Sequence, residues 1–213
     1  GHKPTFKGSE DFVGQIIHPQ EWNSSIDYEN KKVAVIGSGA TAVTLIPQIA
    51  KKASHVTMIQ RSPTYIASAP SKYKILHLLN YISPKLGYKI IRFTNILRQR
   101  RIYRRARRSP ELVKNYLLDL VRDELPGFDI EKHFTPSYNP WEQRLCLAPD
   151  SDFFESINQK KVSVETETID SFSEKGVKLD SGKLIEADII ITATGIKLQN
   201  FGGIRIFVDK NEI

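Results

Sequence analysis

The sequence predicts an α/β protein with a parallel core sheet, an inserted helical segment and a β-meander. Three observations carry this prediction. Two short β-branched runs, 32–36 and 188–193, have the composition of strands that are buried on both faces of a parallel sheet. A segment with helical periodicity, 71–125, separates them. From residue 162 onward the pattern alternates with a period of two and is interrupted by turn residues.

Length and composition are those of a folded globular chain. Of its 213 residues 40% are hydrophobic and 26% are charged, which excludes a disordered or fibrous protein. The sequence contains no apolar run of the roughly 18–20 residues that a membrane-spanning helix needs. Its single cysteine, Cys146, permits no internal disulfide, and we expect a cytoplasmic protein. Because the chain starts at Gly1 without a methionine and stops just after an expected strand, we also expect a fragment of a longer protein.

The positive charge is concentrated in one segment. The net charge is +7, but residues 72–108 contain twelve Lys or Arg and no acidic residue, so the rest of the chain is mildly acidic. Three interpretations stay open. The segment is a lid whose cations are solvated or ion-paired, a membrane-surface contact in which 75–79 and 90–91 supply apolar residues, or a nucleic-acid site at 98–108. Nucleic acid is the least favoured of the three.

The first elements form a strand–turn–helix–strand unit. Residues 1–30 lack a sustained period and are predicted to be a loop. A strand at 32–36 is followed by glycines and then by a helix at 40–53, which Pro47 should kink. A second strand at 55–60 completes a unit of the length expected for a βαβ crossover.

The middle of the chain is predicted to be helical and then irregular. A helical period is present at 75–82 and again at 90–97. The clearest helix begins at Ser109, the expected N-cap before Pro110, and ends before Pro126-Gly127. Three prolines in 128–150 predict an ordered loop. Later strands are expected at 162–167, 168–173, 177–179, 184–185 and 188–193.

The strongest chemical signal is the glycine motif that follows the first strand, Gly37-Ser38-Gly39-Ala40-Thr41-Ala42. Its first glycine permits a tight turn, and its second lets a pyrophosphate approach the backbone. Ala42 permits close packing of helix on strand, and the helix N-terminus offers N–H groups to an anion. A glycine turn without a ligand is the alternative. The strand before the motif and the helix after it favour a Rossmann-like dinucleotide-binding domain.

The end of the second strand indicates which dinucleotide is bound. Sites for NAD or FAD usually place a carboxylate there to bind a ribose hydroxyl. This chain has Gln60-Arg61-Ser62-Pro63, and no carboxylate lies between His55 and Tyr65. A guanidinium can hold a 2′-phosphate that a carboxylate would repel, and Ser62 can add a hydroxyl. We therefore expect NADP(H), with a solvated surface role for Arg61 as the alternative.

One segment resembles a known family fingerprint. Residues Phe12–Trp22 fit the pattern F-x-G-x-x-x-H-x-x-x-W without a mismatch. This pattern resembles that of the Baeyer–Villiger monooxygenases, within the flavin-containing monooxygenase group, where it also precedes the NADP-binding glycine motif. The stretches Gln60–Tyr65, His133–Trp141 and Ala193-Thr194-Gly195 are similar to the same family. The resemblance therefore extends over most of the chain.

The resemblance implies a larger enzyme in which an NADP domain is inserted into an FAD domain. FAD would be bound mainly by a domain absent from this chain. NADPH reduces FAD, O2 reacts with the reduced flavin, and a ketone or a soft heteroatom of a small organic substrate is oxygenated. The implied division has a linker at 1–30, the NADP domain at 31–70 and 128–200, a basic helical insertion at 71–127, and the start of the return to the FAD domain at 201–213. An isolated NADP domain should bind nucleotide without turnover.

Family roles transfer to individual positions. Arg144 matches an arginine that stabilises the oxygenated flavin in the family, although Gln143 replaces the usual lysine beside it and a structural loop arginine is the alternative. His18 matches the fingerprint histidine, which acts in the linker and affects coupling; a structural histidine is equally compatible. Thr194 and Gly195 would line the cofactor cleft, or else make a tight turn.

Other chemistry finds no support in the sequence. The five histidines and Cys146 lack metal-ligand spacing, so no metal site is predicted. A stand-alone NADP-dependent reductase is the main alternative, and the absence of a recognisable Tyr-x-x-x-Lys pair argues against it. A basic module that binds a membrane surface or nucleic acid is the second alternative.

Overall fold

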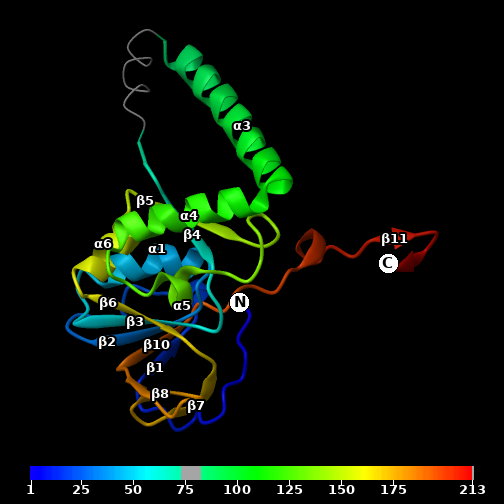
Figure 1. Cartoon of the computed structure of the whole chain (residues 1–213). Helices are drawn as coiled ribbons and strands as arrows, with labels where there is room; N and C mark the ends of the chain where they lie inside the picture. The colour runs from blue at the N-terminus through cyan, green and yellow to red at the C-terminus, as the bar shows by residue number, and fades with distance from the viewer. Residues whose placement is uncertain (73–82, 213) are drawn as a thin grey trace.

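A five-stranded parallel sheet forms the centre of the computed structural model, which describes residues 1–72 and 83–212 (Figure 1). The strand order is β1-β10-β2-β3-β6, and every neighbouring pair is parallel. The predicted α/β class with a parallel core is confirmed. The strands are β1 Gln15–Ile17, β2 Lys32–Ile36, β3 His55–Gln60, β6 Val162–Thr166 and β10 Ile189–Thr192.

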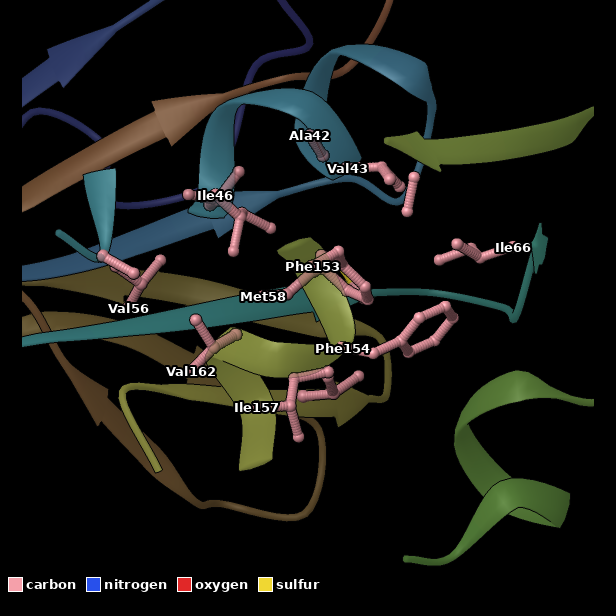
Figure 2. Packing of buried hydrophobic residues seen from close by; sticks show 14 of the residues in the cluster. Ala42, Val43, Ile46, Val56, Met58, Ile66, Phe153, Phe154, Ile157 and Val162 are labelled. Atoms are coloured by element: carbon pink, nitrogen blue, oxygen red, sulfur yellow. The ribbon is translucent and has the colours of Figure 1, made fainter. Parts of the chain in front are cut away.

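Helices cover one face of this sheet. They are α1 Ala40–Ile49, α4 Pro110–Glu124, α5 Ile130–Phe134 and α6 Asp152–Asn158. Figure 2 shows Val43 and Ile46 of α1 within the same buried cluster as Phe153 and Phe154 of α6, and Met58 of β3 also belongs to it. All five of these side chains are completely buried, and they hold α1 firmly over the sheet.

The β-meander predicted from the period-two pattern covers the opposite face. Strands β7 Ile169–Ser173, β8 Gly176–Leu179 and β9 Leu184–Glu186 pair in antiparallel order. Successive side chains of a strand point to opposite faces, so Val33 and Val35 of β2 join the cluster under the helices, whereas Ala34 and Ile36 join the cluster under the meander. The β-branched run therefore reflects burial on both sides.

The prediction of a loop over residues 1–30 was wrong in one part. Strand β1 lies inside the fingerprint and pairs with β10, with Ile16 opposite Ile190, and a 3-10 helix, η1 Pro19–Glu21, follows it. Three residues are too few to display a period. The partner that makes them a strand lies more than 170 residues further along the chain.

Three other predictions also need correction. The expected loop at 128–150 contains α5 and also β5 Leu145–Pro149, which pairs in parallel with β4 Tyr65–Ala69. The alternating stretch from Val162 was grouped with the meander, but β6 pairs with β3 in the core sheet. Helix α1 ends at Ile49 rather than Ala53, with Pro47 inside it. Helix α6 and strand β4 were not predicted.

The inserted region is helical in its described part. Helix α3, Pro84–Arg108, projects away from the sheet in Figure 1 and leads into α4. Ser109 occupies the N-cap position of α4 and Pro110 its first turn, as predicted, although no side-chain hydrogen bond caps the helix. The helical period expected at 75–82 lies outside the described residues.

The remaining chain leaves the sheet after β10. It forms a 3-10 turn, η2 Asn200–Gly203, and a short hairpin of β11 Phe207–Val208 and β12 Asn211–Glu212 (Figure 1). Across the described residues, none of the helices combines the length and the apolar character that a membrane crossing requires.

Candidate cofactor-binding site

The turn after β2 is shaped by Gly37. Its φ of 123° lies in a region that other residues rarely adopt, and its N–H donates to the carbonyl oxygen of Ile59 at 2.8 Å. A Cβ at this position would lie 2.4 Å from the carbonyl oxygen of Ala193, the residue directly after the neighbouring strand β10. The turn therefore requires glycine because two strands leave no room for a side chain.

Gly39 has the opposite environment. It is the N-cap of α1, with a φ of −79°, and a Cβ added there would meet no atom within 4 Å. No side chain caps the helix, so the first N–H groups of α1 are left for another acceptor. Together with the helix dipole they form a position suited to an anion. Open space over uncapped N–H groups fits a pyrophosphate.

A cavity of about 600 Å³ lies above this turn. It is formed where β2, β3 and β10 end, the edge at which open α/β sheets bind ligands. Of the twelve residues predicted for the site, the cavity is lined by ten: Gly37, Ser38, Gly39, Ala40, Thr41, Arg61, Ser62, Arg144, Thr194 and Gly195. The other two, His18 and Ala42, are buried outside its lining. Ala42 packs in the core beneath α1, which agrees with its predicted packing role.

The charged lining is mixed. Arg61 and Arg144 supply two guanidinium groups, and both residues are exposed to solvent. Glu167, directly after β6, adds a carboxylate that was not predicted from the sequence. That carboxylate accepts hydrogen bonds from the backbone N–H and the hydroxyl of Ser181, which hold it against the β8–β9 turn. The two arginines leave the lining with an excess of positive charge.

A buried hydroxyl connects the glycine turn to Arg144. Thr64 is only 1% exposed, and its Oγ1 lies 3.1 Å from the Ser38 hydroxyl. The same oxygen accepts a hydrogen bond from Nε of Arg144 at 3.3 Å. Thr64 thus joins three segments of the chain at the cavity wall. The signal for it in the sequence was its place in the family-like stretch Gln60–Tyr65.

A second buried network holds the end of β3. The Gln60 side chain is 2% exposed, and its Nε2 donates to the His133 carbonyl at 2.7 Å and to Thr166 Oγ1 at 2.9 Å. Nδ1 of His133 lies 2.8 Å from the same threonine oxygen. Burial lowers the pKa of His133, so the neutral ring is favoured. These bonds tie β3, β6 and α5 together directly below Arg61.

His18 is buried beside the cavity and does not line it. Its Nδ1 accepts a hydrogen bond from the Gln20 N–H at 3.2 Å, and its Nε2 lies 3.2 Å from the carbonyl oxygen of Gly195. A neutral ring with its hydrogen on Nε2 satisfies both contacts. The ring therefore connects the fingerprint to the segment that follows β10.

Cys146 is a packing residue near the same turn. Its thiol lies 3.9 Å from the carbonyl oxygen of Ser38, and burial raises its pKa. A raised pKa disfavours the thiolate that nucleophilic chemistry would need. The part of the chain that the structure describes contains no group of three or more His, Cys, Asp or Glu residues arranged to hold a metal ion.

Sequence comparison gives a family match and close relatives. Residues 2–127 match the family model described as flavin-binding monooxygenase-like. The FAD-containing monooxygenase EthA of Mycobacterium tuberculosis is 50% identical in an alignment that covers all of this chain and 44% of that protein. The probable FAD-binding monooxygenase AlmA of Acinetobacter baylyi is 48% identical over 98% of this chain and 42% of that protein. The chain spans less than half the length of these relatives.

Solved structures share the fold. A steroid monooxygenase bound to NADP matches with a TM-score of 0.73 at 19% identity, over 92% of this chain and 44% of that one. The resemblance that the fingerprint predicted is confirmed by these matches. Both expected cofactors occur among these proteins, since EthA is an FAD-containing monooxygenase and the steroid monooxygenase was solved with NADP.

Proposed function

Because the chain belongs to the flavin-binding monooxygenase-like family, we propose that it is the NADPH-binding part of an FAD-dependent monooxygenase. The whole enzyme would transfer one atom of O2 to a ketone or a soft heteroatom and reduce the other to water with two electrons from NADPH. The observation that carries the proposal is the cavity over the uncapped N-terminus of α1, with Arg61 on its wall.

Different residues of the cavity would contact different parts of the nucleotide. The space above Gly39 and the N–H groups of the first turn of α1 would take the pyrophosphate. Arg61 and Ser62 would take the 2′-phosphate, which only the phosphorylated nucleotide carries. Thr194 and Gly195 would line the part of the cleft that opens after β10.

Arg144 would stabilise negative charge that develops during the flavin chemistry. When FAD is bound by the rest of the full-length protein, it supplies the redox and oxygen chemistry. The contribution of this chain is a cation whose Nε is held by the buried Thr64 hydroxyl, so that its charge needs little reorganisation to stabilise a developing negative charge. His18 would act indirectly, because its ring faces the Gly195 carbonyl.

The proposed division of the chain follows from the family. Residues 31–70 and 128–200 would form the NADP domain, with 71–127 as a helical insertion and 201–213 leading toward the FAD domain. In support, strands from both parts of the NADP domain share one sheet. Strand β1 of the 1–30 segment also joins that sheet, so the fingerprint is continuous with it.

Calorimetric titration of the chain with NADPH and NADH tests the proposal. We expect NADPH to bind more tightly. Arg61→Ala should weaken NADPH binding by about 10- to 100-fold, the cost of one charge-assisted contact, and change NADH binding little. Arg92→Ala is the matched control, since Arg92 is exposed on α3 and does not line the cavity.

Three results would contradict the proposal. They are equal affinity for the two nucleotides, no binding of either, and equal losses for NADPH and NADH in Arg61→Ala. Hydride transfer from NADPH to a small carbonyl compound without added flavin would instead support a stand-alone reductase.

A further inference from the structure

Helix α3 has an unusual charge composition. Its 25 residues include ten Lys or Arg and no Asp or Glu. The helix extends away from the sheet, and the figure shows its far end well separated from the body of the molecule (Figure 1). At its near end Ala106 is buried in a cluster with Tyr65, Val113 and Leu117, which fixes the helix to β4 and α4. Helix α3 is therefore fixed at its base and projects as an exposed, strongly cationic helix.

The projecting half of α3 also exposes large apolar side chains. Leu86 is 51% exposed and Phe93 is 63% exposed, and Ile90 between them is 39% exposed. These residues recur at i, i+4 and i+7 and therefore lie on one face of the helix. The same face continues toward the base of the helix with Arg104 and Arg108. One face is thus apolar toward the tip and cationic toward the base.

We propose that α3 docks on the surface of an anionic phospholipid bilayer. The apolar residues near the tip enter the boundary between headgroups and acyl chains, and the cations near the base lie among the headgroup phosphates. This is the arrangement of an interfacial amphipathic helix, in which apolar burial and attraction to anionic lipid add together. The proposal is independent of the proposed monooxygenase activity.

Charge and apolar exposure together select this partner. A second copy of α3 would place two strongly cationic helices against each other, which like-charge repulsion opposes. Nucleic acid would satisfy the arginines through its phosphates but would leave Phe93 and Leu86 without an apolar partner. An anionic bilayer satisfies both features of the same helix face.

The repulsion within α3 itself points to the same partner. Arg101, Arg104 and Arg108 follow one another at i, i+3 and i+7, and no acidic residue of the helix is available to separate their charges. Like charges at this spacing destabilise a helix. Anionic headgroups along this face would relieve that repulsion, so lipid binding should also stabilise the helix.

Sedimentation of the 213-residue chain with vesicles tests the proposal. We expect binding to vesicles of phosphatidylcholine and phosphatidylglycerol, no binding to phosphatidylcholine alone, and release as salt is raised. Each cation near an anionic surface strengthens binding about fivefold. The triple variant R101Q/R104Q/R108Q should therefore partition at least about tenfold less, and Phe93→Ser should also reduce partitioning.

Matched variants separate a local site from net charge. The control K160Q/K161Q/K178Q removes the same charge from exposed lysines outside α3 and should bind within about twofold of the unmodified chain. Leu184→Ser, on the meander, is the control for Phe93→Ser. Circular dichroism checks that every variant is folded.

Several outcomes would overturn the proposal. They are the absence of binding to anionic vesicles, equal losses in the two triple variants, and insensitivity to Phe93→Ser. Displacement of the chain from vesicles by an equal concentration of duplex DNA phosphate would also overturn it, in favour of nucleic acid.

Discussion

Replacement by alanine should have different effects at Gly37 and at Gly39, which lie two residues apart in the glycine motif. At Gly37 the added Cβ would lie 2.4 Å from the Ala193 carbonyl oxygen, on a backbone with φ of 123°. At Gly39 the added Cβ would meet nothing within 4 Å, and the φ of −79° suits alanine. Gly37→Ala should therefore damage the fold, whereas Gly39→Ala should damage only ligand binding.

The magnitudes follow from these contacts. For Gly37→Ala, the positive φ costs about 1–2 kcal/mol. Moving β2 or β10 to relieve a contact with fixed backbone costs a further 1–3 kcal/mol or so. The total of about 2–5 kcal/mol is a large part of the roughly 5–15 kcal/mol that stabilises a typical domain. Gly39→Ala should change stability by less than about 1 kcal/mol, because alanine restricts the unfolded chain but is a poorer N-cap than glycine, and the two effects oppose each other.

Urea denaturation and NADPH titration together check the pair. Gly37→Ala should unfold at clearly lower urea concentration with an unchanged slope. Gly39→Ala should unfold at the same urea concentration as the unmodified chain and bind NADPH at least about tenfold more weakly, because its methyl group occupies the space over the α1 N-terminus. Equal stability of the two variants would refute the packing argument at Gly37. Undiminished NADPH binding by Gly39→Ala would refute the placement of the pyrophosphate.

Two further predictions concern the buried networks. Thr64→Val should lower the free energy of unfolding by about 1–3 kcal/mol, since Ser38 and Arg144 both lose a hydrogen-bond partner. Thr64→Ser, which keeps the hydroxyl, should restore it. An unchanged free energy of unfolding in Thr64→Val would show that these hydrogen bonds do not stabilise the fold. His133 has a pKa lowered by burial, so the unfolded chain binds the extra proton more readily. Its stabilising contribution is complete above pH 6.5 and is lost as the pH falls through the lower pKa of the folded state, by at most about 1.4 kcal/mol per pH unit. Urea denaturation between pH 7.5 and 5 should show this decrease in the free energy of unfolding. If His133→Gln shows the same decrease, the decrease comes from other titratable groups.

The parts of the fold predicted from sequence are those that local pattern determines. Strands β2, β3 and β10 carry β-branched runs because both of their faces are buried, and the glycine motif begins where β2 ends. The apolar period of α4 reflects one buried face. In each case the spacing of apolar residues along the element reflects which of its faces are buried.

The missed elements depend on partners distant in sequence. Strands β4 and β5 pair with each other across 80 residues, from Tyr65 opposite Leu145 onward, and neither has a distinctive period. Prolines near β5 suggested a loop, but Pro149 belongs to an edge strand of a two-stranded sheet, where a missing N–H is tolerated. Glu167, which lines the cavity, and Thr64, which bonds to the lining residues Ser38 and Arg144, were missed for the same reason, because tertiary contacts place them there.

The fingerprint histidine shows how a motif can mark a site without entering it. His18 lies in the η1 N-cap position, and its Nδ1 accepts the Gln20 N–H, which orients the ring. Because β1 pairs with β10, the other ring nitrogen meets the carbonyl of Gly195, a residue with φ of 103° at the point where the chain leaves the sheet. The histidine therefore contacts the chain at the point where it leaves the sheet beside the cavity. Loss of the His18 ring would remove one of the bonds to Gly195, and this is the route that the proposed effect of His18 on coupling between the two cofactors would take.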